Sequence, residues 1–355
     1  MFLGGSIMEK EKDSGFKGFL SKSMPMIRYT FKRILYLIPV AIGIAFILYV
    51  IIQQMPGDPA SALMDPEKPF DQDLYNAIRE QLGLDGPIIV RFFKWLWNLL
   101  QGNFGYSTIT GGKPIGPYIG TAISNTFRVN LIGYIIAIVV AIVVGIKAAV
   151  DRSSFFDNFW TIFSLIGISM PSFFFAMVLI FIFVINLGWF PMNGMISTQL
   201  PKDATQWMIY KDMLWHMVLP IAVVTLGSLP GLFRYVRNSM LEVLNQDYIR
   251  TARAKGLKDK TVIYRHAFRN ALLPIVTVIG SMLPGLFSGS ITVEAIFVYP
   301  GVGQLLNRSI TMRDANVTMV LLVFFAVLQL ISNLVVDISY ALVDPRIRVG
   351  GGSSE

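Results

Sequence analysis

The 355-residue sequence contains no cysteine and few charged residues. Charged residues make up 15% of the chain and apolar residues 54%, whereas water-soluble domains carry about 25% charged residues. The lack of cysteine excludes disulfides, thiolate metal sites and cysteine nucleophiles. Two histidines, His216 and His266, are too few for a histidine metal cluster. Because one soluble core of this size cannot bury so many apolar residues, the sequence is that of a membrane protein.

A nucleotide-binding loop is also missing. Gly111-Gly112-Lys113 is followed by Pro114 and lacks the upstream glycine of the Gly-x4-Gly-Lys-Ser/Thr motif. We therefore expect no catalytic, cofactor-binding or metal-binding residues in this chain, and we expect any ATP hydrolysis to occur on another protein.

Six stretches are apolar and long enough to cross a bilayer, which takes about 20 residues. We predict an all-α polytopic membrane protein with six transmembrane helices: about Ile34–Gln53, Val129–Ile146, Phe159–Leu187, Met217–Phe233, Leu272–Val293 and Val317–Val336. No small-residue cleavage site follows the first stretch, so we expect it to be retained and not removed as a signal peptide.

Basic residues are distributed unevenly over the loops between these spans. Twenty of the 30 Lys and Arg residues lie in one set of segments: residues 1–33, 147–158, 234–270 and 337–355. These segments carry a net charge of +9, and the remaining ones −1. Since cytoplasmic loops are rich in Lys and Arg, we predict that both termini are cytoplasmic and that residues 54–128 and 294–316 are external. The total charge of +8 then reflects topology and not binding to nucleic acid.

The centres of the six spans contain no Asp, Glu, Lys or Arg. Ionisable residues within a bilayer usually mark ion sites and proton relays, so their absence argues against a secondary carrier or channel. An intramembrane enzyme is the third alternative. It is disfavoured because His216 and His266 are expected near opposite membrane faces and cannot cooperate.

Prolines recur in the spans, and each one frees a backbone carbonyl that lipid cannot satisfy. Ordinary helix packing is an equal explanation for any single proline. Together they favour kinked helices around a pathway, with kinks at Pro171, Pro220, Pro230, Pro274 and Pro284.

The cytoplasmic loop 234–270 is predicted to form two helical stretches, about 239–255 and 258–270, separated at Gly256, a residue suited to end a helix. Tyr248, Ile249, Ala252 and Gly256 lie on one face of the first stretch. Such a small apolar face with basic flanks suits a groove in a partner protein. A helix lying on anionic lipid is the alternative.

This loop reads Asp247-Tyr-Ile-Arg-Thr-Ala-Arg-Ala-Lys-Gly256 and then Arg265-His-Ala-Phe-Arg-Asn-Ala-Leu-Leu-Pro274. It resembles the coupling loop of ABC importer permeases, in the form typical of B-type permeases for oligopeptides, dipeptides or nickel. The general signature has Glu-Ala-Ala six residues before the glycine. Here Arg250, Thr251 and Ala252 occupy those positions, a departure that the peptide branch shares.

Other stretches resemble the same branch in the same order along the chain. They are Pro56-Gly-Asp-Pro59, Gly102-Asn-Phe-Gly-Tyr-Ser107, Val293-Glu-Ala-Ile-Phe297, Pro300-Gly-Val-Gly303, Arg313-Asp314 and Asp344-Pro-Arg-Ile-Arg348. The resemblance implies a type I ABC importer permease in a prokaryotic cell (inner) membrane. The implied partners are a second, homologous permease, two cytoplasmic ATPases that hold ATP and magnesium, and an external solute-binding protein. Peptide is the expected substrate, with nickel or oligosaccharide as alternatives.

The resemblance also implies which residues contact the ATPase. They are Asp247, Tyr248, Ile249, Arg250, Thr251, Ala252, Arg253, Ala254, Lys255, Gly256, Arg265 and His266. Ala252 and Gly256 are expected to fit a cleft in the ATPase because they are small, while Arg250, Arg253 and Lys255 set the register through charge pairs.

The external loops contain two predicted amphipathic helices, Asp71–Gly83 and Ile88–Gln101, the second rich in aromatic residues. Aromatic side chains favour the membrane interface, and docking of the binding protein is the functional alternative. The charged docking candidates are Glu294, Arg308, Arg313 and Asp314. They could equally form a solvated surface or pair with one another.

Overall fold

The computed structural model describes residues 30–54, 59–62, 64, 69–81 and 85–343. Most of the N-terminal tail (1–29), Pro56-Gly-Asp58 and the C-terminal Asp344–Arg348 lie outside the described residues, so the predictions for them stay predictions.

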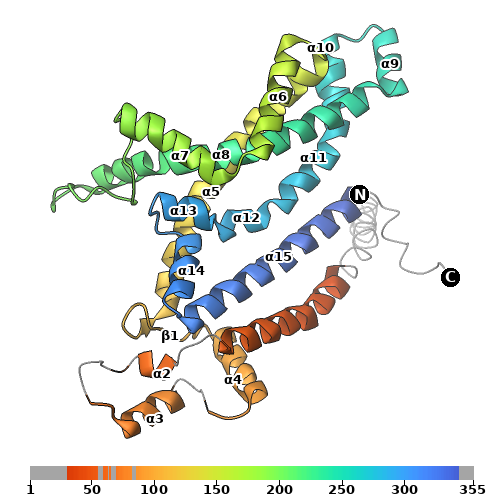
Figure 1. Cartoon of the computed structure of the whole chain (residues 1–355). Coiled ribbons are helices and arrows are strands. Elements are labelled where there is room, and N and C mark those ends of the chain that lie inside the picture. Colours follow the sequence, from red (N-terminus) through yellow and green to blue (C-terminus); the bar gives the residue numbers. More distant parts are fainter. Residues whose placement is uncertain (1–29, 55–58, 63, 65–68, 82–84, 344–355) are drawn as a thin grey trace, which may run out of the picture.

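The described chain is almost entirely helical (Figure 1). Helix Thr30–Gln53 precedes a small external region made of α2 (Pro59–Ala62), α3 (Gln72–Gln81), α4 (Ile88–Leu100), β1 (Tyr106–Ser107) and β2 (Lys113–Pro114). The next elements are α5 (Ile115–Val150), α6 (Phe155–Ser169), α7 (Ser172–Leu179), the π-helix η1 (Ile180–Asn186) and α8 (Gln206–Leu244). The last are α9 (Asp247–Ala254), α10 (Asp259–Thr261), the π-helix η2 (Val262–Phe268), α11 (Arg269–Ser281), α12 (Leu283–Ser288), α13 (Ile291–Ile296), α14 (Val302–Thr311) and α15 (Ala315–Val343).

The small external elements agree with one prediction and depart from another. Helices α3 and α4 confirm the two amphipathic helices expected before residue 102. The antiparallel pair β1–β2, with Tyr106 opposite Pro114, is a minor exception to the all-α expectation.

Two groups of short elements lie at opposite ends of the molecule, and the segment between α7 and α8 forms a separate projection (Figure 1). At one end, which we call the α9 end, α9 and η2 pack against the last turns of α5 and α8 around Ile146, Met240 and Val262. At the other, the α14 end, the beginning of α5 packs against α14 and the first turns of α15 around Ile115 and Leu305. The fold therefore separates these two groups of elements, and which of them is cytoplasmic stays a prediction.

Helix Thr30–Gln53 and α15 lie side by side. Ala45 and Ile52 meet Met319 and Val323 in a common core. Near the chain termini, Arg33 forms an ion pair of 3.0 Å with Asp337. The first helix thus begins on the side where α15 ends. This agrees with the predicted topology, in which both termini lie on one side of the membrane.

The third predicted span, Phe159–Leu187, is not one continuous helix. Helices α6 and α7–η1 meet at a bend of 106°. Met170 is extended (φ −87°, ψ 129°) because a following proline disfavours the helical conformation. Pro171 is the N-cap of α7, which begins at Ser172, so the predicted kink at Pro171 is a complete break.

The fifth predicted span, 272–293, matches the candidate span Pro274–Ile296 but is interrupted. It is divided into α11, α12 and α13. The chain turns at Met282 before Pro284, and again at Gly289, which has a positive φ of 64°. Pro284 thus stands at a break, whereas α8 and α11 continue through Pro220, Pro230 and Pro274.

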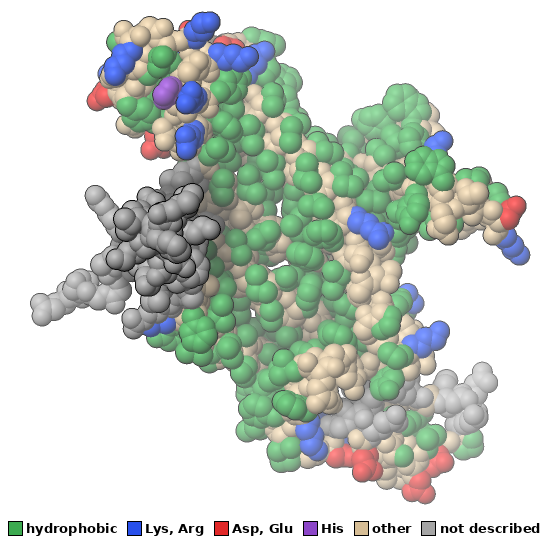
Figure 2. Space-filling view, turned by 180° about the vertical axis from the view of Figure 1, so that it is seen from behind, with side chains coloured by type: hydrophobic (Ala, Val, Ile, Leu, Met, Phe, Trp, Pro, Cys, Tyr) green, Lys and Arg blue, Asp and Glu red, His purple; other side chains and the backbone are tan. Residues whose placement is uncertain are grey.

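Helices α5 and α8 extend well beyond the predicted 129–146 and 217–233, because hydropathy marks only the apolar centre of a long helix. By length and composition, five helices can cross a membrane, or six if the bent α6–α7 pair counts as one span. Figure 2 shows apolar side chains over most of the visible face, with groups of charged side chains at its top and bottom and a few more along its right-hand side.

Candidate functional site

The segment from α9 to η2 is the candidate site for contact with a partner. Helix α9 begins with Asp247 and has Arg253 in its last turn, charges that complement the helix dipole. Gly256 has a φ of +76°. Its N–H donates to Arg253 O at 2.9 Å, and Leu257 N donates to Ala252 O at 3.4 Å. This Schellman arrangement ends the helix and confirms the break predicted at Gly256.

The break before α9 was not predicted. The first helical stretch was expected to run from about 239 to 255, but α8 ends at Leu244 and α9 begins at Asp247, with Asn245 and Gln246 between them. The chain therefore turns between the long helix and the short one, and α9 is a separate element.

The apolar face of α9 points into its own chain. Ile249 is fully buried and Ala252 nearly so, and both belong to one core with Val262 and Ala267 of η2. The expectation that Ala252 enters a partner's cleft is therefore wrong. Periodicity correctly placed Ile249 and Ala252 on the apolar face but wrongly added Tyr248 and Gly256, which are exposed. The buried part of the face packs against the following helix.

The opposite face of α9 is open. Tyr248, Thr251 and Lys255, spaced three and four residues apart, are all exposed, so they form one surface. Arg250 lies 3.6 Å from Asp247 and Arg253 lies 3.7 Å from Asp259, exposed ion pairs that contribute little stability. Any partner at this end meets a basic surface with a tyrosine at its edge.

The remaining predicted contact residues extend this surface. Asp247, Ala254 and Gly256 are exposed, as is Arg265 in η2, whereas His266 is half-buried. An added Cβ at Gly256 would have no atom within 4 Å. Within this chain the glycine is therefore required by its backbone conformation and not by crowding, and its fit to a partner's cleft stays a prediction.

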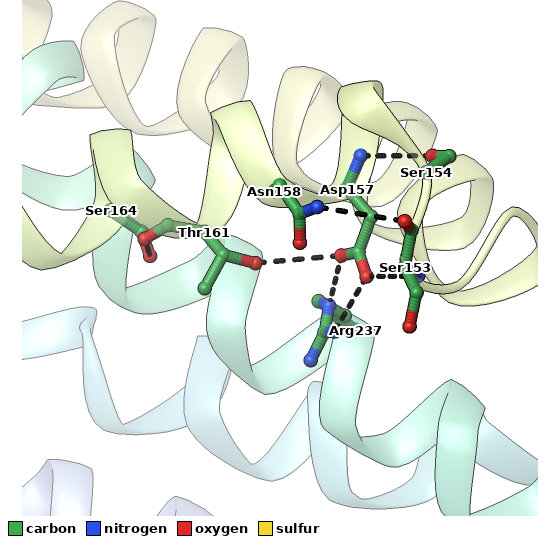
Figure 3. Close-up of polar contacts among 7 residues, drawn as sticks. All are labelled: Ser153, Ser154, Asp157, Asn158, Thr161, Ser164 and Arg237. Carbon is green, nitrogen blue, oxygen red and sulfur yellow. Dashed lines mark hydrogen bonds and ion pairs between the residues drawn. The ribbon is translucent and has the colours of Figure 1, made fainter.

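A buried ion pair braces α8 just before this segment (Figure 3). Asp157, at the beginning of α6, is 1% exposed. Arg237 of α8 binds it through two nitrogens, with Nη2 donating to Oδ2 at 2.8 Å. Such bidentate pairs fix geometry as well as charge. The pair ties the turn between α5 and α6 to α8, seven residues before α8 ends.

Local hydrogen bonds hold the Asp157 carboxylate in place. Ser153 N donates to its Oδ2 at 2.9 Å, and Ser154 Oγ caps α6 by accepting from Asp157 N at 3.1 Å (Figure 3). The helices also approach closely here, because a Cβ on Gly145 of α5 would lie 2.8 Å from Val236 of α8. The Ser-x-x-Asp capping pattern was the available sequence signal, but it does not identify Arg237 as a partner.

The α14 end also contains buried carboxylates, and they correct the docking prediction. Glu294 is 7% exposed. It accepts hydrogen bonds from Thr126 Oγ1 at 2.7 Å and Gln304 N at 3.0 Å. Val302 N in turn donates to Thr126 Oγ1. Glu294 thus joins α13, α14 and α5 and is not available to a docking protein.

Asp314 plays a similar role beside the hairpin. It is 1% exposed and accepts from Ser107 Oγ at 2.7 Å and from Val317 N at 3.1 Å. It therefore fastens β1 to the first turn of α15. Of the four docking candidates only Arg308 and Arg313 are exposed, the latter with a φ of 57°.

Fold and site together define a polytopic helical membrane protein with a braced, exposed basic helix at one end. Residues 137–349 match the family described as "Binding-protein-dependent transport system inner membrane component", and residues 26–142 match the corresponding N-terminal family. The chain belongs to this family and is a multi-pass inner-membrane component of such a transport system.

Three relatives match over most of the chain. The oligopeptide transport system permease protein AppB of Bacillus subtilis is 41% identical, covering 91% of this chain and 99% of AppB. A putative peptide permease of Brucella suis is 38% identical over 91% of this chain and 100% of its own length. The glutathione transport system permease protein GsiC of Salmonella typhimurium is 35% identical, covering 91% and 99%.

A solved structure supports the fold. The inward-facing MetNI methionine ABC transporter has a chain that matches with a TM-score of 0.51 and 19% identity, covering 65% of this chain and 99% of its own. The fold is thus that of an ABC importer permease, as the resemblance implied.

Proposed function

We propose that this chain is one of two permease subunits of an ATP-driven importer that moves peptides delivered by a binding protein. The observation that carries the proposal is the similarity, over 91% of the chain, to permeases named for oligopeptide and peptide transport. The relative named for glutathione transport supports a peptide cargo over nickel or oligosaccharide, because glutathione is a tripeptide.

In this proposal the chain has no cofactor of its own, and two separate ATPases bind ATP and magnesium. Closure of the ATPases pushes on the outer face of α9, the surface formed by Tyr248, Thr251 and Lys255. Because Ile249 and Ala252 share a core with η2 and the end of α8, α9 cannot move alone. A rigid displacement then passes to the spans.

The Asp157–Arg237 pair extends this rigid unit to α6. A force on α8 reaches α6 through two charged hydrogen bonds and the close approach of Gly145 to Val236. The pair therefore serves as a positioning contact within the moving unit.

A second permease is expected to cover apolar surface that a single chain leaves exposed. In the most apolar windows of Thr30–Gln53 and Pro274–Ile296, only 11% and 6% of the residues are buried. Lipid covers the parts of these helices that face away from the second subunit.

The direct test is uptake into proteoliposomes that contain the full complex. We expect entry of a labelled oligopeptide to require both ATP and the binding protein. Uptake by this chain alone, driven by an ion gradient, would support a secondary carrier instead. ATP-dependent uptake of nickel but not of peptide would support the assignment as an importer but contradict the proposed peptide substrate.

The α9 contact can be tested separately. Thr251→Glu with Lys255→Glu reverses the charge of the outer face without touching the core. We expect these variants to fold normally but to lose the copurifying ATPase. Lys211→Glu, an exposed lysine far from α9, is the matched control and should retain it.

The absence of cysteine makes the proposed orientation easy to measure. A single cysteine at Thr251 should react with a membrane-impermeant maleimide only after the cytoplasmic face is opened. A single cysteine at Lys113 should react in intact cells. The reverse pattern would invert the topology.

A further inference from the structure

A cavity of about 330 Å³ lies at the α14 end, apart from the α9 site. Its walls come from α4, the end of helix Thr30–Gln53 and the beginning of α15. Gln53 is the last residue of one apolar span and Ala315 the first of another. The cavity therefore lies at the level where hydrocarbon gives way to lipid headgroups.

Two basic side chains, Arg91 and Lys94, supply positive charge to the polar part of the cavity. Arg91 Nη2 donates to Gln53 Oε1, but Arg91 Nε is buried and has no hydrogen-bond partner among the described residues. Lys94 also lines the cavity, and the described residues place no carboxylate within 4 Å of it. Glu80 is the acidic residue in the lining, which leaves a net charge of +1.

The lining also includes Asn98, Asn103 and Asn316, and the remaining side chains are largely apolar or aromatic. Tyr49, Ile52 and Met319 are buried, and Trp95 is half-buried beside them. The site therefore combines a guanidinium and an ammonium with an apolar wall. A small soluble anion uses only the first part, whereas an amphiphile with an anionic head uses both.

The geometry points to a binding site for one phospholipid, whose headgroup phosphate is held by Arg91 and Lys94. Arginine suits this role because its planar donors match phosphate oxygens. The glycerol and first methylenes of the lipid lie against Ile52, Trp95 and Met319. The bound lipid would join helix Thr30–Gln53 to α4 and α15 at the membrane surface.

The test is lipid retention by the purified complex, measured by native mass spectrometry with added phosphatidylglycerol. We expect one tightly held lipid in the wild type and at least a tenfold loss of affinity in the double variant Arg91→Gln, Lys94→Gln. Lys113→Gln, an exposed lysine in β2 outside the cavity, is the matched control and should retain the lipid. Arg91→Lys keeps one charge and should be intermediate.

Two results would overturn the proposal. One is wild-type lipid retention by the double variant with an unchanged melting temperature. The other is equally tight binding of inorganic phosphate alone, which would identify a free-anion site. Neither result bears on peptide uptake, so this inference and the proposed function can fail separately.

Discussion

The two ends of the molecule treat their buried carboxylates differently. At the α9 end, Asp157 is paired with a cation, Arg237. At the α14 end, Glu294 and Asp314 receive hydrogen bonds only from hydroxyl and backbone N–H donors in the contacts described above. The first arrangement joins two long helices through their side chains. The second fastens short helices and a hairpin whose backbone would otherwise have few partners.

The same contrast appears on the surface. At the α9 end the charges of α9 point outward, where Arg250, Arg253 and Lys255 meet solvent. At the α14 end, two of the four charged docking candidates point inward. One end thus presents charge to a partner, while the other uses charge to hold its own irregular backbone.

The largest effect is expected from Ala252→Glu, which tests whether the apolar face of α9 is internal. An uncompensated carboxylate in that core should cost about 4 kcal/mol, so the chain should lose its melting transition in detergent. Thr251→Glu, its exposed neighbour, should leave the melting temperature unchanged. Equal melting temperatures for the two variants would place Ala252 on the outer face.

Arg237→Met is expected to have the next largest effect. It leaves Asp157 buried and unpaired, at a cost of about 3 kcal/mol. Adding Asp157→Asn removes the stranded charge and should recover most of the lost melting temperature. If the double variant is no more stable than Arg237→Met alone, the ion pair does not brace α8.

Glu294→Ala tests the α14 end. It leaves the Gln304 N–H and the Thr126 hydroxyl without their acceptor, which should cost about 2 kcal/mol. Glu294→Gln keeps an acceptor oxygen and should cost less, as judged by the melting temperature. An equal loss in both variants would show that the negative charge itself, and not the hydrogen bonds, is needed.

The smallest effect concerns backbone conformation at the α9 end. Gly256→Ala should destabilise by about 1 kcal/mol, because the left-handed φ disfavours a side chain although space is available. Gly231→Ala, inside α8 with no atom within 4 Å of the added Cβ, should have the opposite sign. Matching shifts in melting temperature would contradict this account of Gly256.

Several features were predictable from sequence because they depend on local composition. The membrane class, the approximate apolar centres, helices α3 and α4, the break at Gly256 and the family all follow from patterns along the chain. The bend at Pro171 was placed correctly but underestimated. A proline at that position is compatible with anything from a kink to a full break. The close packing of Gly167 against Pro230 involves a residue 63 positions away, so the size of the bend could not be read from local sequence.

The sequence by itself determined that this chain crosses a membrane and belongs to an importer, because hydropathy and motif order are properties of adjacent residues. Only the tertiary structure decided which side chains are buried and which partners they contact. It turned Ile249 and Ala252 inward, buried Glu294 and Asp314, paired Asp157 with Arg237 across 80 residues, and brought Arg91 to a cavity between two spans. Burial and charge pairing depend on neighbours that are distant along the chain, and only the fold brings those neighbours together.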